Sequence, residues 1–298
     1  MTITAKHAAR PPLACEIAAD RVLAGRSANA GRMVEVCSTS ELAPGTLVPD
    51  LVEPNVHGGS AVRQAIESAL GGIAGRSRDV IAILPDTVVR VVLLDFETLP
   101  SKREEAEAVV RFRLKKSLPF NLEDARISYH AQTAGTGVRA VAAVVLNSVL
   151  AEYESAFRDA GYSPGLVMPS MLAALGAADA ERPTLVVKVD ARTISIAILD
   201  QEQLLLFRTL ENLRGVTITG EQLAEEVYPS VVFFQDTYSL NLERIYVAGL
   251  PESGGAAPAL KAQTGAVVEE LVAASQIGSI NGSVPRWRLA GVVGALIA

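Results

Sequence analysis

The chain is poor in aromatic residues, in cysteine and in long apolar runs. Phe, Tyr and Trp make up 5% of its 298 residues although 49% are hydrophobic, so the core must be built largely from Ala, Val, Leu and Ile. Two cysteines, Cys15 and Cys37, are too few for a disulfide scaffold and fit a reducing cytosol. The longest apolar run, residues 289–298, is shorter than the roughly 20 residues that a bilayer-spanning helix needs.

Basic stretches and a secretory leader are missing as well. The formal net charge is −6, and without a long run of Lys and Arg the chain lacks the electrostatic footprint of a nucleic-acid-binding protein. Residues 1–12 contain basic residues but no apolar segment, so they do not read as a signal peptide. We therefore expect a cytoplasmic protein with a disordered N-terminus at residues 1–12, no nucleic-acid partner and no direct membrane insertion.

What is present is an α/β pattern in two halves. In the first half, apolar residues 13–27 and 33–39 predict an opening strand hairpin, and residues 41–59 predict a loop. A helix is expected over residues 60–70 with Ser60 as its N-cap, and a fully buried strand over residues 79–85. The length of the chain suits two modest domains, or one domain with an insertion.

The second half repeats the opening of the first. After helices predicted at residues 148–160 and 169–178, a composition break at 177–183 leads into three predicted strands over 184–210. The remaining predicted elements are a helix over 220–240, whose continuity through Pro229 is left open, a strand over 244–250, and a closing apolar helix expected to pack on the second lobe. A strand–turn–strand start in each half is a weak internal repeat.

Residues 88–147 form a separate strand–helix–strand–strand module within the first half. A strand pattern runs into Leu99-Pro100, and a charged helix follows, with Ser101 as predicted N-cap and Glu104 at capping-box spacing. The helix ends at Leu118-Pro119-Phe120, and strand patterns follow at 125–132 and 138–146.

This module resembles the inserted subdomain of the PilM family of type IV pilus assembly proteins, which are actin-like relatives of the cell-division protein FtsA. The resemblance extends over most of residues 13–298 and is specific over residues 79–132. It implies a two-lobed actin-like (ribonuclease H-like) α/β fold. The implied divisions are a first lobe of residues 13–87 and 148–180, an inserted subdomain of residues 88–147, and a second lobe of residues 181–298.

In that family, glycine turns of the form Asp-x-Gly-Ser/Ala hold the phosphates and the metal, and a Gly-Gly turn holds the adenosine. Glycine permits close approach and the acid serves magnesium. At the first turn this chain has Glu16 and Ala18 in place of Asp and Gly, and at the second it has Lys188 and Asp190. A shifted alignment makes Asp190 the acid but then places Arg192 at the glycine. The third turn keeps only Gly249.

The resemblance, combined with these departures, implies a scaffold protein and not an enzyme. We expect no catalytic residue, no metal site, and vestigial nucleotide positions at Glu16, Ala18, Lys188, Asp190 and Gly249, with Mg-ATP binding as the alternative. The implied partner is the cytoplasmic N-terminal segment of a PilN-like inner-membrane protein, which would hold this chain at the membrane; other pilus components such as the assembly ATPase are further candidate partners. The candidate docking residues are Leu99, Pro100, Leu118, Pro119 and Phe120. Two alternatives stay open: an active actin-like ATPase or filament former, and a cytoplasmic component of a type II secretion platform.

Overall fold

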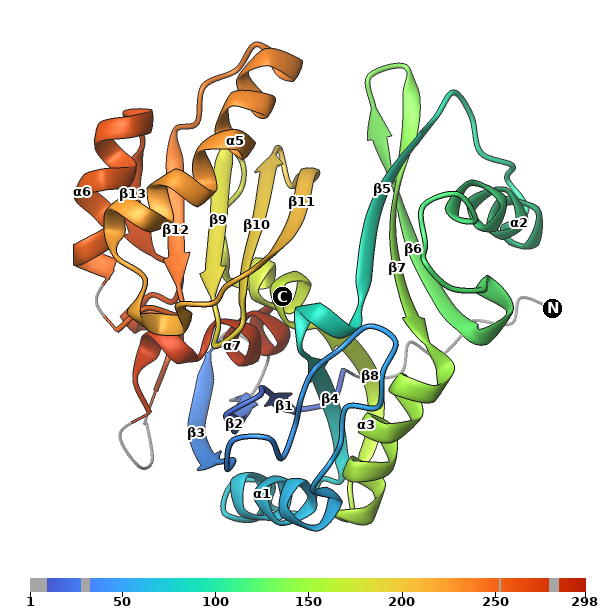
Figure 1. Cartoon of the computed structure of the whole chain (residues 1–298), viewed down its shortest axis with the longest axis vertical. Coiled ribbons are helices and arrows are strands. Elements are labelled where there is room, and N and C mark those ends of the chain that lie inside the picture. Colours follow the sequence, from blue (N-terminus) through green and yellow to red (C-terminus); the bar gives the residue numbers. More distant parts are fainter. Residues whose placement is uncertain (1–9, 28–32, 252, 279–283) are drawn as a thin grey trace, which may run out of the picture.

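The computed structural model describes residues 10–27, 33–251, 253–278 and 284–298, and Figure 1 shows them as two lobes with a smaller sheet at one side. Residues 1–9 of the predicted disordered segment lie outside the described residues. Across the described ranges, no helix combines the length and apolar character needed to cross a bilayer.

The first lobe is built on a five-stranded sheet of order β3-β2-β1-β4-β8. Its strands are β1 (Leu13–Ile17), β2 (Arg21–Ser27), β3 (Val34–Glu41), β4 (Asp79–Leu84) and β8 (Ser163–Pro169). Helices α1 (Gly59–Gly71) and α3 (Asn147–Asp159) pack on one face of this sheet and against each other, burying one apolar core.

The second lobe repeats this arrangement with the order β11-β10-β9-β12-β13. Its strands are β9 (Thr184–Val189), β10 (Thr193–Asp200), β11 (Gln203–Glu211), β12 (Arg244–Ala248) and β13 (Val267–Glu270). In both sheets an antiparallel meander of three strands continues into two parallel strands. Helices α5 (Gly220–Tyr238) and α6 (Ser253–Thr264) cover one face of this second sheet. The predicted internal repeat and the two-lobed α/β fold are confirmed.

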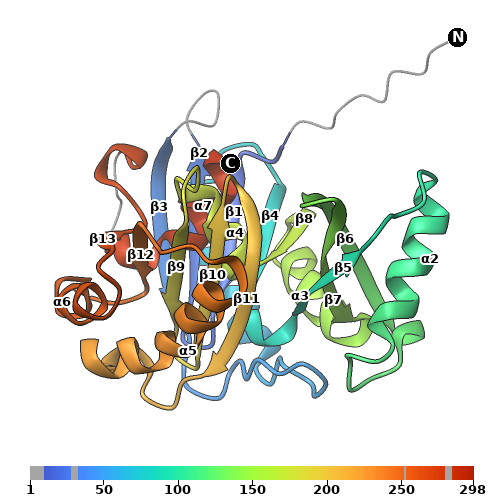
Figure 2. The same ribbon diagram turned by 90° about the horizontal axis from the view of Figure 1, so that it is seen from above.

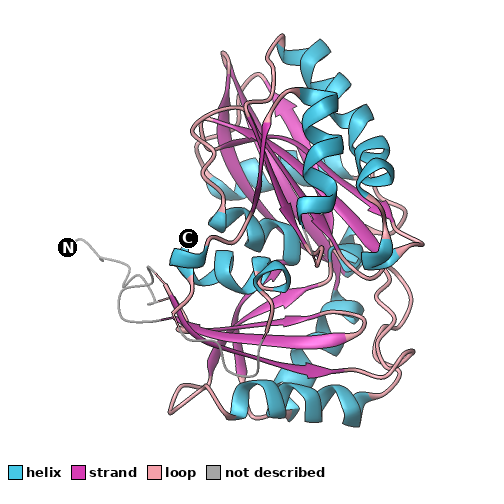
Figure 3. Cartoon of the chain, turned by 90° about the vertical axis from the view of Figure 1, so that its left-hand side faces the viewer, coloured by secondary structure: helices cyan, strands magenta, loops and turns pink. Residues whose placement is uncertain are grey.

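A layer of short helices lies between the two sheets (Figure 3). It contains α4 (Ser170–Ala174), the 3-10 turn Leu175–Ala177, and α7 (Ala290–Ile297). Helix α7 contacts α4, β1 and β2 and shares one apolar core with strands of both sheets, so the apolar tail packs between the lobes and not, as predicted, on the second lobe alone. Its small residues explain the placement: a Cβ on Gly294 would lie 2.2 Å from the Ala173 carbonyl oxygen, so only glycine lets α7 approach α4 this closely.

The inserted subdomain has the predicted strand–helix–strand–strand order. It consists of β5 (Arg90–Phe96), α2 (Arg103–Leu114), β6 (Ala125–Ala134) and β7 (Gly137–Leu146), with sheet order β5-β7-β6. Ala106, Val110 and Leu114 form the buried stripe of α2. The expected Ser101 cap is wrong, because the N-cap position is Lys102, which makes no side-chain capping bond and instead pairs with Glu105.

Three further local predictions are corrected by the structure, which also shows two strands that were not predicted and answers one open question. The opening hairpin is a three-stranded meander, because the chain turns back at residues 18–20. The sequence did not predict β8, which contains prolines that edge strands tolerate, or the four-residue strand β13. The helix expected over 169–178 is only α4 plus a 3-10 turn, and α1 begins at Gly59 with Gly58, not Ser60, at its N-cap. Helix α5 continues without a break through Pro229.

Candidate functional site

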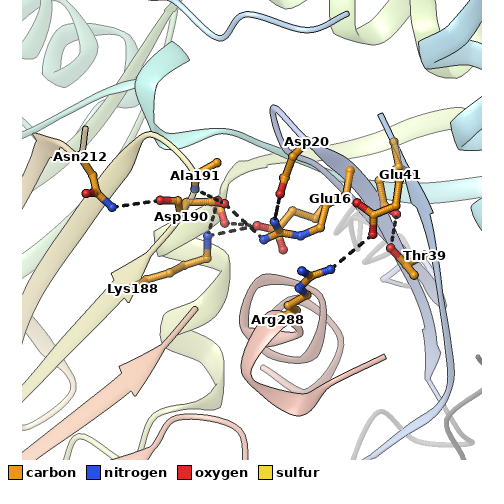
Figure 4. Close-up of polar contacts among 12 residues, drawn as sticks. Glu16, Asp20, Thr39, Glu41, Lys188, Asp190, Ala191, Asn212 and Arg288 are labelled. Carbon is orange, nitrogen blue, oxygen red and sulfur yellow. Dashed lines mark hydrogen bonds and ion pairs between the residues drawn. The ribbon is translucent and has the colours of Figure 1, made fainter. Parts of the chain in front are cut away.

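The turn after β1 and the turn after β9 face each other between the lobes (Figure 4). Each is a tight turn closed by its own backbone: the Ala18 N–H donates to the Arg21 carbonyl, and the Asp190 N–H to the Thr193 carbonyl, both at 2.8 Å. These are the two turns that the resemblance assigns to phosphate binding.

Four charged side chains join the turns. The Lys188 ammonium lies 3.0 Å from Asp190 Oδ2 and 3.3 Å from Glu16 Oε1, and the Arg21 guanidinium lies 3.3 Å from Asp190 Oδ1. Glu16 and Arg21 belong to the first lobe, whereas Lys188 and Asp190 belong to the second. Lys188, Glu16 and Arg21 are each no more than 4% exposed. We call Glu16, Arg21, Lys188 and Asp190 the interlobe cluster; the Arg21 guanidinium is also paired with Asp20 of the first turn, at 2.7 Å.

Neighbouring groups hold Glu16 from the other side. The Ser170 hydroxyl, at the start of α4, donates to Glu16 Oε1. The second carboxylate oxygen, Oε2, lies against the first turn of α7, where a Cβ on Gly291 would come within 2.5 Å of it. Oε2 has no hydrogen-bond partner among the described residues, and the positive end of the α7 dipole favours its charge. Gly291 therefore makes the space that the Glu16 carboxylate occupies.

The charges of the second lobe stay ionised despite burial. Burial by itself lowers the pKa of Lys188, but the carboxylates of Asp190, Glu16 and Asp86 outweigh it, so that this pKa is raised overall. Burial likewise acts to raise the pKa of Asp190, yet Lys188 and Arg21 hold it below its ordinary value. Lys188 and Asp190 therefore form a true ion pair at neutral pH.

A second buried carboxylate, Asp86, lies beside the cluster. It follows β4 and accepts hydrogen bonds from the Met171 N–H at 2.8 Å and from the Ser195 hydroxyl of β10 at 2.7 Å. Burial raises the pKa of Asp86. One side chain thus connects the first lobe, the helical layer and the second lobe.

Gly249 allows the turn after β12 to lie close to the end of β9. It follows β12 with φ +83°, and a Cβ there would lie 1.7 Å from the Val189 carbonyl oxygen. Its N–H donates to the Trp287 carbonyl at 2.8 Å. The glycine is required by the contact with the end of β9, which carries Lys188 one residue earlier.

These residues do not fit Mg-ATP as the resemblance would place it. The Ala191 N–H of the second turn donates to Asp190 Oδ1 at 3.0 Å, so it is not free to donate to a phosphate. The acid of the first turn is paired with Lys188, and the aspartate at the glycine position of the second turn would repel a phosphate. No group of three metal-capable side chains occurs in the described part of the chain.

The predicted docking residues lie apart from this cluster, in the inserted subdomain. Leu99, Leu118 and Phe120 are half-buried against the apolar core that the first lobe shares with the inserted subdomain, Pro100 is half-buried, and Pro119 is exposed. The structure thus brings three of the five against one core.

Sequence reasoning found Glu16, Lys188 and Asp190, which the structure joins, and placed Ala18 and Gly249 at the adjoining turns. It missed Arg21, Asp86 and the two serines that bond the carboxylates. A signal for two of them existed: Arg21 stands between the first turn and the apolar residues 22–24, and Asp86 follows the buried strand β4 after one proline. The serines carry no such signal, because only the tertiary fold brings them to the cluster.

Comparison with solved structures places this arrangement in a known fold. A chain of the PilM-PilN type IV pilus biogenesis complex superposes with a TM-score of 0.79 over 96% of this chain and 97% of that chain, at 19% identity. The chain has the fold of PilM. The cytoplasmic domain of EpsL, an inner-membrane component of the type II secretion system of Vibrio cholerae, is similar with a TM-score of 0.53, 12% identity and coverage of 93% and 92%. The ethanolamine utilization protein EutJ from Carboxydothermus hydrogenoformans reaches 0.50 at 10% identity, with coverage of 97% and 90%. No sequence-family description and no curated protein matches the chain.

Proposed function

We propose that this protein is a PilM-like scaffold of type IV pilus assembly. It would dock the cytoplasmic N-terminal segment of a PilN-like inner-membrane protein and thereby sit at the inner membrane. The observation that carries the proposal is the likeness to PilM of a PilM-PilN complex, which extends over 96% of the chain and includes the inserted subdomain.

We propose further that the scaffold works without ATP and is not an enzyme. The support is the interlobe cluster: Lys188 pairs with carboxylates from both turns and so supplies, from the chain itself, positive charge between the lobes. A ligand that entered would have to break buried ion pairs, and breaking one by removing a partner costs roughly 3–5 kcal/mol.

The docking residues remain as proposed from the sequence: Leu99, Pro100, Leu118, Pro119 and Phe120. Their support is that Leu99, Leu118 and Phe120 pack on one apolar core, and that all five keep part of their surface exposed. An extended peptide needs such apolar contacts together with backbone hydrogen bonds, and no catalytic group. The division of the chain at residues 87/88, 147/148 and 180/181 also stays a proposal, with α7 assigned to the layer between the sheets.

A peptide-binding assay tests the docking function. A labelled peptide from the cytoplasmic N-terminus of a PilN-like protein should bind saturably, and a scrambled peptide should not. Pro119→Ala, at an exposed position, should weaken binding, whereas Phe112→Ala, at a 68% exposed position of α2, should leave it unchanged. The proposal fails if no PilN-like segment binds. Binding of an EpsL-type partner in its place would favour the type II secretion alternative, for which the EpsL likeness is the specific observation.

A further inference from the structure

Two sheet edges face each other between the inserted subdomain and the second lobe (Figure 2). β5 ends the subdomain sheet and pairs only with β7, and β11 ends the second-lobe sheet and pairs only with β10. Among the described residues, no backbone hydrogen bond joins β5 to β11. Edge strands of this kind present backbone donors and acceptors that another strand can pair with.

One residue of the β11 edge, Leu204, already has both backbone groups hydrogen-bonded to a side-chain amide, as they would be to a neighbouring strand. The Gln132 amide of β6 donates to the Leu204 carbonyl at 2.7 Å and accepts from the Leu204 N–H at 3.2 Å. The outer edge of β11 at Leu204 is therefore oriented toward the inserted subdomain and is capable of forming ladder-type bonds.

The rest of that edge can be oriented from the register. The Asn212 N–H donates to the Arg192 carbonyl at 2.8 Å, so residue 212 faces β10. A bulge separates Leu204 from the following residues, and beyond it antiparallel strands alternate inward and outward groups. Phe207, Thr209 and Glu211 therefore direct their backbone groups away from β10. No described backbone partner pairs with these three.

Two cavities border this edge. One, of about 510 Å³, is lined by residues 207–211 together with the start of the inserted subdomain and the loop at residues 49–51. The other, of about 550 Å³, is lined by residues 205–208, residues 90–93 of β5, and Pro229 and Phe233 of α5. Together they follow β11 over residues 205–211, or roughly 23 Å of strand.

The lining combines apolar side chains with excess positive charge. Phe207 is half-buried and Phe233 is 51% exposed. Arg90, Arg192 and Arg208 line the first cavity, and none of the three has an ion-pair partner within the part of the chain that the structure describes.

The acids of the first cavity offset only part of this positive charge. The Asp50 carboxylate accepts the N–H groups of Val52 and Glu53, which lower its pKa and keep it charged, and Asp86 is buried and bonded to Ser195. Asp50 and Glu211 therefore oppose three arginines, and the net positive charge that remains favours an anionic occupant.

We propose that an extended segment of a partner protein adds as a strand to the outer edge of β11. Its backbone pairs with Phe207, Thr209 and Glu211, its apolar side chains pack on Phe207 and Phe233, and one or more of its carboxylates lie among the arginines. This surface is separate from the one formed by Leu99, Pro100 and residues 118–120. A failure of the proposed docking of a PilN-like segment would therefore leave this proposal unaffected, and the reverse also holds.

Synthetic peptides test the chemistry of the occupant. An eight-residue peptide of alternating Val and Glu, ending in Thr, should bind saturably below about 1 mM. Replacing its Glu by Lys should weaken binding by about tenfold or more, as expected for lost charge-assisted bonds. Hydrogen exchange of the complex should show new protection of the Phe207 and Thr209 amides.

Two variants at one position isolate the backbone contribution. Thr209→Pro removes an outward N–H without removing a bond to β10, and an edge strand tolerates such a proline. It should weaken peptide binding by about tenfold, whereas Thr209→Ala keeps the N–H and should bind as the unaltered protein does. If thermal denaturation shows that the proline variant does not fold, Arg192→Ala, at an exposed position, takes its place and should also reduce affinity for the acidic peptide.

Several outcomes overturn the inference. They are absence of saturable binding by the acidic peptide, equal binding of the Lys peptide, and amide protection elsewhere than on β11. Sedimentation must also show a monomer, because a dimer that Thr209→Pro dissociates would mean that a second copy of this chain occupies the edge.

Discussion

Replacement of Lys188 by methionine removes the central cation of the interlobe cluster. At an effective dielectric constant of about 20, each of its two ion pairs contributes roughly 5 kcal/mol of gross attraction at the observed distances of 3.0 and 3.3 Å. Desolvation of the ammonium offsets several kcal/mol of this sum. Glu16 and Asp190 are then left close together with Arg21 as their remaining cation. We expect Lys188→Met to lower the free energy of unfolding by about 3–5 kcal/mol.

Urea denaturation measures this loss, with the single tryptophan, Trp287, as a fluorescent reporter because its carbonyl accepts the Gly249 N–H next to the end of β9. Lys102→Met is the matched control: Lys102 also forms an ion pair at 3.0 Å, with Glu105, but its side chain is 81% exposed. The control should change stability by less than about 1 kcal/mol. Equal effects of the two substitutions would refute the view that burial gives the cluster its strength.

A double-mutant cycle measures the coupling between Glu16 and Lys188. Glu16→Gln should lower the free energy of unfolding much less in the Lys188→Met background than in the unaltered protein, because the pair is already broken.

The stability at acid pH depends on Asp190, whose pKa is lowered mainly by Lys188 and Arg21 against the opposing effect of burial. Its contribution is present above the ordinary carboxyl value of about 4 and is lost as the pH falls through the lowered pKa. Lys188→Met should remove most of that acid-dependent loss.

Three further predictions concern other contacts. The raised pKa of buried Asp86 means that its stabilising effect declines as the pH rises above about 4, so Asp86→Asn should gain stability relative to the unaltered protein between pH 4 and 8; a pH-independent difference would contradict this. Gly249→Ala should lower the melting temperature severely because a Cβ meets the Val189 carbonyl, whereas Gly72→Ala, with nothing within 4 Å, should be tolerated; similar melting temperatures would count against the close approach. Gln132→Ala should speed amide exchange at Leu204 and cost about 1 kcal/mol; unchanged exchange there would exclude the paired amide.

Much of the fold could be predicted because its strongest signals are local. The buried strand β4, the stripe of α2 and the strand-rich start of the second lobe follow directly from hydrophobic periodicity. Elements whose identity depends on tertiary contacts were missed. β8 contains Pro164, Gly165 and Pro169, and it forms a strand because it pairs with β4 at the sheet edge. Likewise, the small residues of α7 suit several surfaces, and only the contact with α4 decides among them.

The candidate site was predictable as a set of positions but not as a set of bonds. Comparison with the glycine-turn pattern marked Lys188 and Asp190 as departures, each of which reads as a loss of function when taken singly. In the fold their charges are complementary, because Lys188 pairs with Asp190. Lys188 also pairs with Glu16, which lies 172 residues away in sequence. Such pairing across two lobes has no periodic signature, so it required the three-dimensional structure.

We propose that the side chains of the interlobe cluster, and not a nucleotide, link the two lobes. Titration calorimetry of the full chain with Mg-ATP tests it most directly, accompanied by a measurement of the melting temperature. We predict no saturable heat up to about 1 mM Mg-ATP and an unchanged melting temperature. Saturable binding with a micromolar dissociation constant, together with a melting temperature that rises with Mg-ATP concentration, would contradict the claim.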